Sequence, residues 1–147
     1  MTAIELQVIP YKVDPNNPIH LEENGRKLIG IYKDYYPVIG FHLPWVGYFI
    51  IQNEKLVGSC SFNGKPKDDI VEISYWTFEG FEGNGIATQA CKILTQMALN
   101  EDPEISVTAK TAPEENASTH ILKKNGFQYV KVVQDHEIGD AWLWELK

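Results

Sequence analysis

The segment of this sequence most suited to chemistry is a glycine-rich turn, Glu82-Gly83-Asn84-Gly85-Ile86-Ala87-Thr88. It lies between a strand predicted over 70–76 and a helix predicted over 84–99. Glycines let the backbone turn tightly and approach a ligand closely. The first N–H groups of a helix are unpaired and point one way, where the helix dipole favours negative charge. The turn therefore predicts an anion site of the kind that holds a phosphate or a pyrophosphate.

Three interpretations of this turn compete. A Walker A loop requires Gly-Lys followed by Ser or Thr, whereas Gly85 is followed by Ile86 and Ala87. A dinucleotide fingerprint requires a third glycine, and Thr88 occupies that position. The third interpretation is a tight turn that holds no ligand. From the turn alone, two interpretations stay open: a phosphate site that follows neither of these two patterns, and a plain turn without a ligand.

A carboxylate in the preceding strand is a candidate general base. Within IVEISYW (70–76), alternation places Val71, Ile73 and Tyr75 on one face and Glu72, Ser74 and Trp76 on the other. Burial among apolar neighbours is expected to raise the pKa of Glu72 towards the range useful for proton transfer. The alternative is a carboxylate on an exposed strand face, or one bonded to neighbouring backbone.

The elements that position these residues follow the order β, α, β, β, β, α, β, α, β, β. This order predicts an α/β (α+β) fold, with one mixed sheet and helices packed on its faces. The strand, turn, helix and strand between 70 and 110 form a βαβ unit, so part of the sheet is expected to be parallel. Strands are predicted over 3–9, 45–52, 56–62, 70–76, 104–110, 127–133 and 141–146, and helices over 19–36, 84–99 and 115–124.

Whole-chain properties limit the classes of function. The 147 residues fit a single domain, 1–147, and 44% hydrophobic residues with 22% charged is a globular composition. A net charge of −7 argues against nucleic-acid binding. No signal peptide or membrane-length apolar stretch is visible, and Cys60 and Cys91 fit buried reduced thiols, so we expect a cytoplasmic protein without a membrane partner. The four histidines lack metal-ligand spacing, so no metal is expected.

The turn and its surroundings resemble the GNAT family of N-acetyltransferases. In that family the acyl-CoA loop follows the pattern Gln/Arg-x-x-Gly-x-Gly/Ala. Here Gly85 and Ala87 fit the last two positions, and Glu82 stands at the Gln/Arg position. The segments GYFII, VGSCSF and VEISYW resemble the family's central strands. The run from Thr111 to Ser118 and the segment LKKNGF (122–127) resemble a later motif, most closely that of ribosomal-protein N-terminal acetyltransferases.

This resemblance covers 45–146 with some specificity and the first 40 residues only by the order of elements. It implies a largely antiparallel sheet of six to seven strands with a central βαβ cofactor unit. It also implies transfer of acetyl from acetyl-CoA to a primary amine by direct attack in a ternary complex. The acceptor that the resemblance implies is a small molecule or a protein N-terminus. A non-catalytic acyl-CoA-binding module and a transferase for longer acyl chains stay open, and the exposed edge of the closing strands allows a homodimer.

Residue by residue, the resemblance implies roles in cofactor binding and catalysis. Glu72 is the expected base, and Ser118 is expected near the sulfur, because Leu122 stands where many relatives carry a Tyr acid. Helix capping is the alternative for Ser118. Asn116 is expected to bond the pantetheine arm. The pyrophosphate loop comprises Gly83, Asn84, Gly85, Ile86, Ala87 and Thr88, and the strand that pairs with pantetheine contributes Ile73, Ser74 and Tyr75.

Candidate acceptor residues lie in the N-terminal half, near the expected acceptor pocket. These residues are Tyr35, Tyr36, His42 and Trp45. Core packing is the alternative for the three aromatic side chains. The sequence does not identify the amine.

Overall fold

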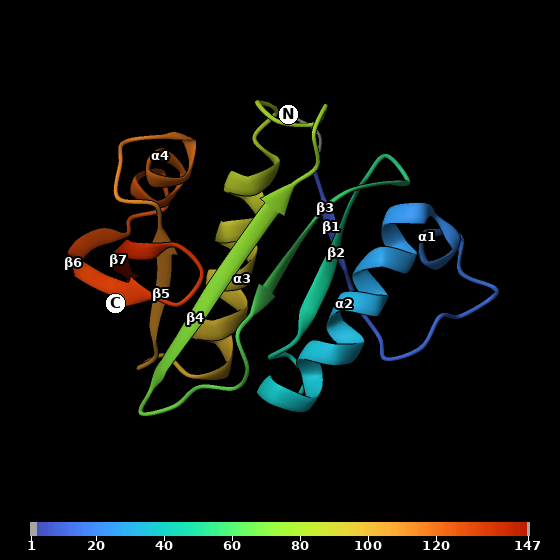
Figure 1. The fold of residues 1–147 in the computed structure, drawn as a ribbon, viewed down its shortest axis with the longest axis horizontal. Coiled ribbons are helices and arrows are strands. Elements are labelled where there is room, and N and C mark those ends of the chain that lie inside the picture. The colour runs from blue at the N-terminus through green and yellow to red at the C-terminus, as the bar shows by residue number, and fades with distance from the viewer. Residues whose placement is uncertain (1–2, 147) are drawn as a thin grey trace.

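The computed structural model describes residues 3–146 and has one sheet with helices on both faces (Figure 1). The seven strands are ordered β1-β2-β3-β4-β5-β7-β6. Neighbouring strands run antiparallel except β4 and β5, as the sequence predicts. The elements are β1 (Glu5–Val8), α1 (Pro18–Leu21), α2 (Glu23–Ile39), β2 (Gly47–Gln52), β3 (Lys55–Phe62), β4 (Ile70–Thr77), α3 (Ile86–Glu101), β5 (Ser106–Thr111), α4 (Ala117–Lys124), β6 (Gln128–Asp135) and β7 (Gly139–Leu146).

The first helical region is two helices, which corrects the single helix expected over 19–36. Glu22 has an extended backbone, with ψ at 151°, and it ends α1 and precedes α2. Asn17 caps α1 by accepting a hydrogen bond from the Ile19 N–H. A side chain at Gly25 would collide with the Ile19 carbonyl oxygen, so glycine lets α2 pack closely against α1. Apolar periodicity continues across the break, which is why spacing alone merged the two helices.

The central strands are buried on both faces. In β2 and β3 nearly every residue is buried, because helices cover the sheet on both sides. On one side, the Tyr36 hydroxyl of α2 donates to the Ile9 carbonyl (2.6 Å) and accepts from the Gly47 N–H (3.2 Å). On the other side α3 crosses behind β4 in Figure 1 and buries Cys91 and Leu94 completely. Within residues 3–146, no helix combines the length and apolar character that a membrane span requires.

The parallel pairing of β4 with β5 is short. It covers Ile70–Glu72 opposite Ser106–Thr108 and ends there. The remainder of β4 continues to pair with β3 on its other edge, up to Thr77. The sheet therefore splits between β4 and β5 immediately after Glu72. We refer to this point as the sheet split.

The closing hairpin is longer than expected. The segment 134–140 was expected to be a loop, but β6 extends to Asp135 and β7 begins at Gly139. The Asp135 carboxylate accepts from the Glu137 N–H (2.8 Å) and the Ile138 N–H (3.3 Å), which stabilises a tight turn. Because β6 is the sheet edge and mostly exposed, polar residues such as Gln134 are compatible with a strand there.

Candidate active site at the sheet split

The glycine-rich turn forms the N-terminus of α3 with the backbone that glycine permits. Gly83 has φ of 82° and Gly85, the residue preceding the helix, has φ of 74°. No side chain caps this helix, and its first turn carries no acidic residue. The Asn84 side chain donates to the Phe81 carbonyl (3.1 Å) and so stabilises the turn itself. No side-chain cap occupies the first N–H groups of α3, where the sequence predicts an anion site.

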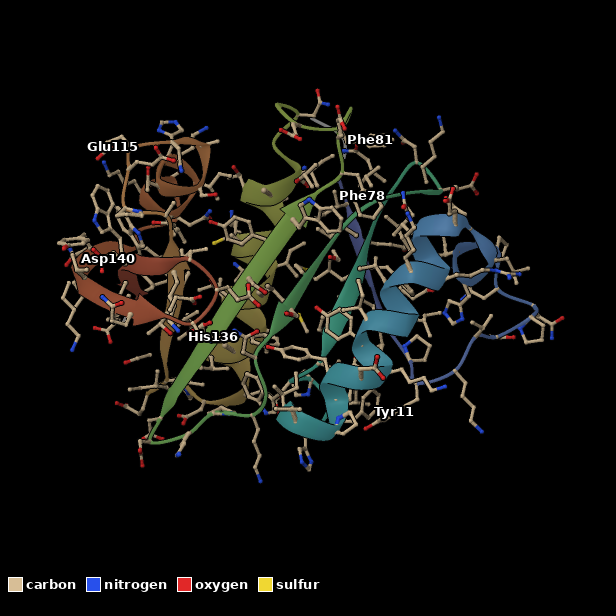
Figure 2. All side chains as sticks on the ribbon, in the orientation of Figure 1. Tyr11, Phe78, Phe81, Glu115, His136 and Asp140 are labelled. Atoms are coloured by element: carbon tan, nitrogen blue, oxygen red, sulfur yellow. The ribbon has the colours of Figure 1, made fainter. Side chains whose placement is uncertain are left out.

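A cleft of about 470 Å³ lies between this turn, the end of β4 and helix α4. It brings together seven of the predicted cofactor and catalytic residues: Tyr75, Gly83, Gly85, Ile86, Ala87, Thr88 and Ser118. The cleft also contains residues that the sequence analysis did not select: Trp76, Thr77, Phe81, Glu82, Ala117, His120, Ile121 and Lys124. Figure 2 places Phe81 beside the turn above the end of β4 and Glu115 on the α4 side. Strand, turn and helix thus supply three walls of one cleft.

Tyr75 and Ser118 meet in this cleft. The Tyr75 hydroxyl donates to the main-chain carbonyl of Ser118 (3.4 Å), and burial raises the pKa of Tyr75 well above its usual value. Leu122 is fully buried, as expected for a residue that does not act in the cleft. The N-cap of α4 is Asn116, which exchanges hydrogen bonds with Thr119. Capping is therefore the observed use of the Asn116 side chain and not of Ser118.

Glu72 lies at the sheet split, on the face opposite Tyr75. Its carboxylate is 3.3 Å from the Lys110 ammonium and accepts a hydrogen bond from the Asn63 amide. Lys110 also lies 3.9 Å from Asp135, at the end of β6. The Glu72 side chain is 29% exposed. The sequence analysis expected burial among apolar neighbours, whereas the Glu72 side chain is half-buried and both of its carboxylate oxygens have polar partners.

Tyr35 of α2 borders the same region. Its pKa is raised by burial first, and then by the negative charges of Glu72 and Glu137, with Lys110 acting in the opposite direction. In the view of Figure 2, His136, in the turn between β6 and β7, projects over the middle of β4, and Asp135 of the same hairpin lies 3.9 Å from Lys110. Tyr35 of α2 is therefore within electrostatic reach of both the Glu72 carboxylate at the sheet split and Glu137 of the turn between β6 and β7.

The remaining predicted residues lie outside the cleft. Ile73 is buried in the core, and Ser74 faces the α2 side, where its hydroxyl is 3.1 Å from that of Ser61. Tyr36 is fully buried and Trp45 packs edge-to-face on Phe62, so both aromatic side chains contribute to packing. His42 is exposed, and its carbonyl accepts from the Trp45 N–H (2.7 Å).

Two groups of residues were missed for different reasons. His120 and Lys124 follow Ala117 and Ser118 at helical spacing, so the periodicity of α4 could have placed them on the cleft face. Asn63 and Lys110 contact Glu72 through strand pairing. Lys110 reaches Glu72 only because β5 lies parallel to β4 in a particular register, and no local pattern specifies that register.

Comparison with known protein families agrees with this fold and site. A model of the acetyltransferase (GNAT) domain matches residues 7–128. The chain belongs to the GNAT family of acetyltransferases. This match confirms the predicted family, and the observed seven-stranded mixed sheet confirms the predicted fold class.

Individual relatives are consistent with this assignment. The ribosomal-protein-serine acetyltransferase of Escherichia coli (strain K12) is 28% identical over 81 residues, which are 54% of this chain and 45% of that protein. A ribosomal-protein alpha-N-acetyltransferase solved with coenzyme A superposes with a TM-score of 0.72 and 18% identity, over 99% of this chain and 94% of that one. A microcin self-immunity acetyltransferase solved with acetyl-CoA and AMP superposes with a TM-score of 0.66 and 22% identity, over 84% of this chain and 69% of that one. The predicted likeness to ribosomal-protein acetyltransferases is confirmed.

Proposed function

We propose that this protein transfers the acetyl group of acetyl-CoA to a primary amine by direct attack in a ternary complex. One observation carries the proposal. The anion-binding turn opens into a cleft on one face of the sheet, and a carboxylate lies on the other face at the sheet split. A donor held in the cleft and an amine held beside Glu72 can meet where the two strands separate.

The residues of the cleft fit acetyl-CoA. The unpaired N–H groups at the start of α3 suit its pyrophosphate, and positive φ at Gly83 and Gly85 exposes this backbone without a side chain in the way. The pantetheine arm needs main-chain partners. The Val71 carbonyl faces β5 and the Glu72 carbonyl faces β3, so alternation directs the main-chain groups of Tyr75 into the opened gap.

Glu72 is suited to accept the proton that the amine must lose. When bound, acetyl-CoA supplies an activated thioester that a neutral amine can attack. An alkyl amine is mostly protonated at neutral pH, so an acceptor for its proton is required. Lys110 and Asn63 fix the orientation of the Glu72 carboxylate at the sheet split. The negative charge of Asp135 and Glu137 nearby favours a cationic acceptor.

Tyr75 and Ser118 are the candidates to donate a hydrogen bond to the thiolate that leaves. The Tyr75 hydroxyl is protonated at neutral pH, as tyrosine ordinarily is, and can donate a hydrogen bond to a departing thiolate. Burial raises its pKa, so it suits the role of a hydrogen-bond donor better than that of a strong acid. The Ser118 side chain lines the same part of the cleft and is the second candidate donor. The burial of both cysteine thiols supports direct attack by the amine over transfer through an acylated cysteine. Cys60 and Cys91 are 2% and 0% exposed, and burial raises the pKa of Cys91 to about 12, so neither is placed to carry an acyl group.

A protein N-terminus is the acceptor class we favour. The relatives described above include acetyltransferases named for a ribosomal-protein serine and for alpha-N-protein acetylation. The exposed side chain of Tyr35 borders the acidic region around Glu72 and offers a contact for the residue that follows the terminal amine.

Calorimetric titration with acetyl-CoA, followed by an acetylation assay on N-terminal peptides and small amines, tests the proposal. We expect micromolar binding and release of one CoA for each acetylated amine. Binding without turnover over a broad panel would support the non-catalytic module, which the negative charge of Glu82 at the cleft also motivates. No binding at millimolar acetyl-CoA would contradict the proposal.

A further inference from the structure

The cationic groups of the cleft lie on one wall only. Among its lining residues, Glu82 of the turn is acidic, and the two that can carry positive charge, His120 and Lys124, belong to α4. They are four residues apart and so share one helix face. A polyanionic ligand in this cleft is therefore repelled by the Glu82 side and attracted towards α4.

Helix α4 contacts β4 near its start and α3 near its end. Ser118, in its first turn, contacts Tyr75 of β4 through its carbonyl. Lys124 lies six residues further, a rise of about 9 Å along the helix axis. Its neighbour Asn125 donates to the Thr88 carbonyl (3.3 Å) in the first turn of α3, and to the Ile121 carbonyl (3.0 Å). These bonds hold the Lys124 end of α4 against the anion-binding turn.

The backbone of the turn and the side chains of α4 can satisfy two different anions. The N–H groups at the start of α3 are fixed and converge on one phosphate position, which suits the pyrophosphate. Lys124 and His120 belong to a different element, α4, and line the same cleft. CoA carries a further dianion of this kind, the 3′-phosphate on its ribose, and a flexible ammonium is a good partner for it.

We infer that Lys124, assisted by His120, binds the 3′-phosphate and makes this protein select CoA over dephospho-CoA. The inference rests on the proposed use of acetyl-CoA. It assigns a specificity-determining role to residues of α4 that act neither on the thioester nor on the acceptor amine. Lys124 recognises the phosphate by charge, and the turn recognises the pyrophosphate by backbone geometry.

Lys123 offers a matched control on the same helix turn. Its ammonium lies 3.1 Å from both carboxylate oxygens of Glu115 and 6.0 Å from the centre of the Trp144 ring, outside the cleft. Lys123 and Lys124 both lie in the last turn of α4, where they interact similarly with the helix dipole. Lys123→Met and Lys124→Met therefore remove the same charge from the same helix end, and only the second removes it from the cleft.

The test is calorimetric titration of the intact protein with CoA and with dephospho-CoA. We expect wild type to bind CoA about 10-fold more tightly, as a charge-assisted contact with a dianion allows. Lys124→Met should weaken CoA binding about 3- to 10-fold and leave dephospho-CoA within about twofold, whereas Lys123→Met should change neither. His120→Gln should give a smaller loss for CoA alone.

Two results would overturn the inference. One is equal affinity of wild type for the two ligands, and the other is equal weakening of both by Lys124→Met, which would assign the lysine to the pyrophosphate. If wild type binds neither ligand, the proposed function fails and this inference fails with it. Binding of both without selection contradicts this inference alone.

Discussion

Replacing Glu72 by Gln tests the placement of catalysis at the sheet split. The substitution keeps the shape of the side chain and its ability to accept from Asn63, but removes the group proposed to take the amine proton. A positioned general base typically contributes about 10²- to 10⁴-fold to rate. We therefore expect kcat for amine acetylation to fall by about that factor. Acetyl-CoA affinity should stay within about twofold, because Glu72 lies on the face opposite the cleft.

The same substitution should barely affect stability. The ion pair of Glu72 with Lys110 is partly exposed, with side-chain exposures of 29% and 32%. Pairs of this kind contribute about 1 kcal/mol or less, and Lys110 keeps Asp135 at 3.9 Å as a partner. For a chain of this size the melting temperature should fall by about 2–4 °C at most. A large loss of rate with a small loss of stability separates catalysis from folding.

The assay is steady-state acetylation of an N-terminal peptide over about pH 6 to 9, with calorimetry and thermal melting on the same preparations. Lys110→Met is the companion variant, because it removes the ammonium that orients Glu72 and leaves the carboxylate in place. We expect a smaller loss of kcat from Lys110→Met than from Glu72→Gln. Activity of Glu72→Gln within a few-fold of wild type at every pH would refute the role of this carboxylate.

Three further predictions concern the cleft and the thiols. Gly85→Val should weaken acetyl-CoA binding by about 10- to 100-fold through lost phosphate contacts. Gly80→Val, with a similar positive φ and no atom near the added Cβ, should leave calorimetric affinity unchanged. Glu82→Gln should tighten acetyl-CoA binding about 2- to 5-fold at low salt. Unchanged affinity would show that the Glu82 carboxylate does not repel the phosphates of the ligand. Cys60 and Cys91 should resist iodoacetamide at pH 8 until the protein unfolds, because burial raises both thiol pKa values and keeps the thiols protonated. Rapid labelling of the native protein would contradict this protection. Mass spectrometry should also find no acetylated protein during turnover.

Local patterns predicted the parts of the site that depend on local rules. Alternation along β4 correctly separated Tyr75 from Glu72, because strand side chains alternate whatever the fold. The turn needed positive φ at Gly83 and Gly85, and glycine marks such positions directly. The break at Glu22 and the partners of Glu72 could not be predicted in this way. The break depends on the packing of α1 against α2, and the position of Lys110 depends on the register of β5 beside β4.

The sheet split connects two proposed functions of strand β4, which borders the donor cleft on one face and carries Glu72 on the other. Because strand side chains alternate, β4 presents Tyr75 to the cleft and Glu72 to the α2 face, three residues apart on opposite faces. If β5 paired along the whole of β4, the sheet would be closed and the two faces could not exchange a group. Pairing ends at Glu72, so the opening lies beside the carboxylate itself. In the proposed reaction, donor and acceptor therefore occupy opposite faces at the same time, as direct transfer requires.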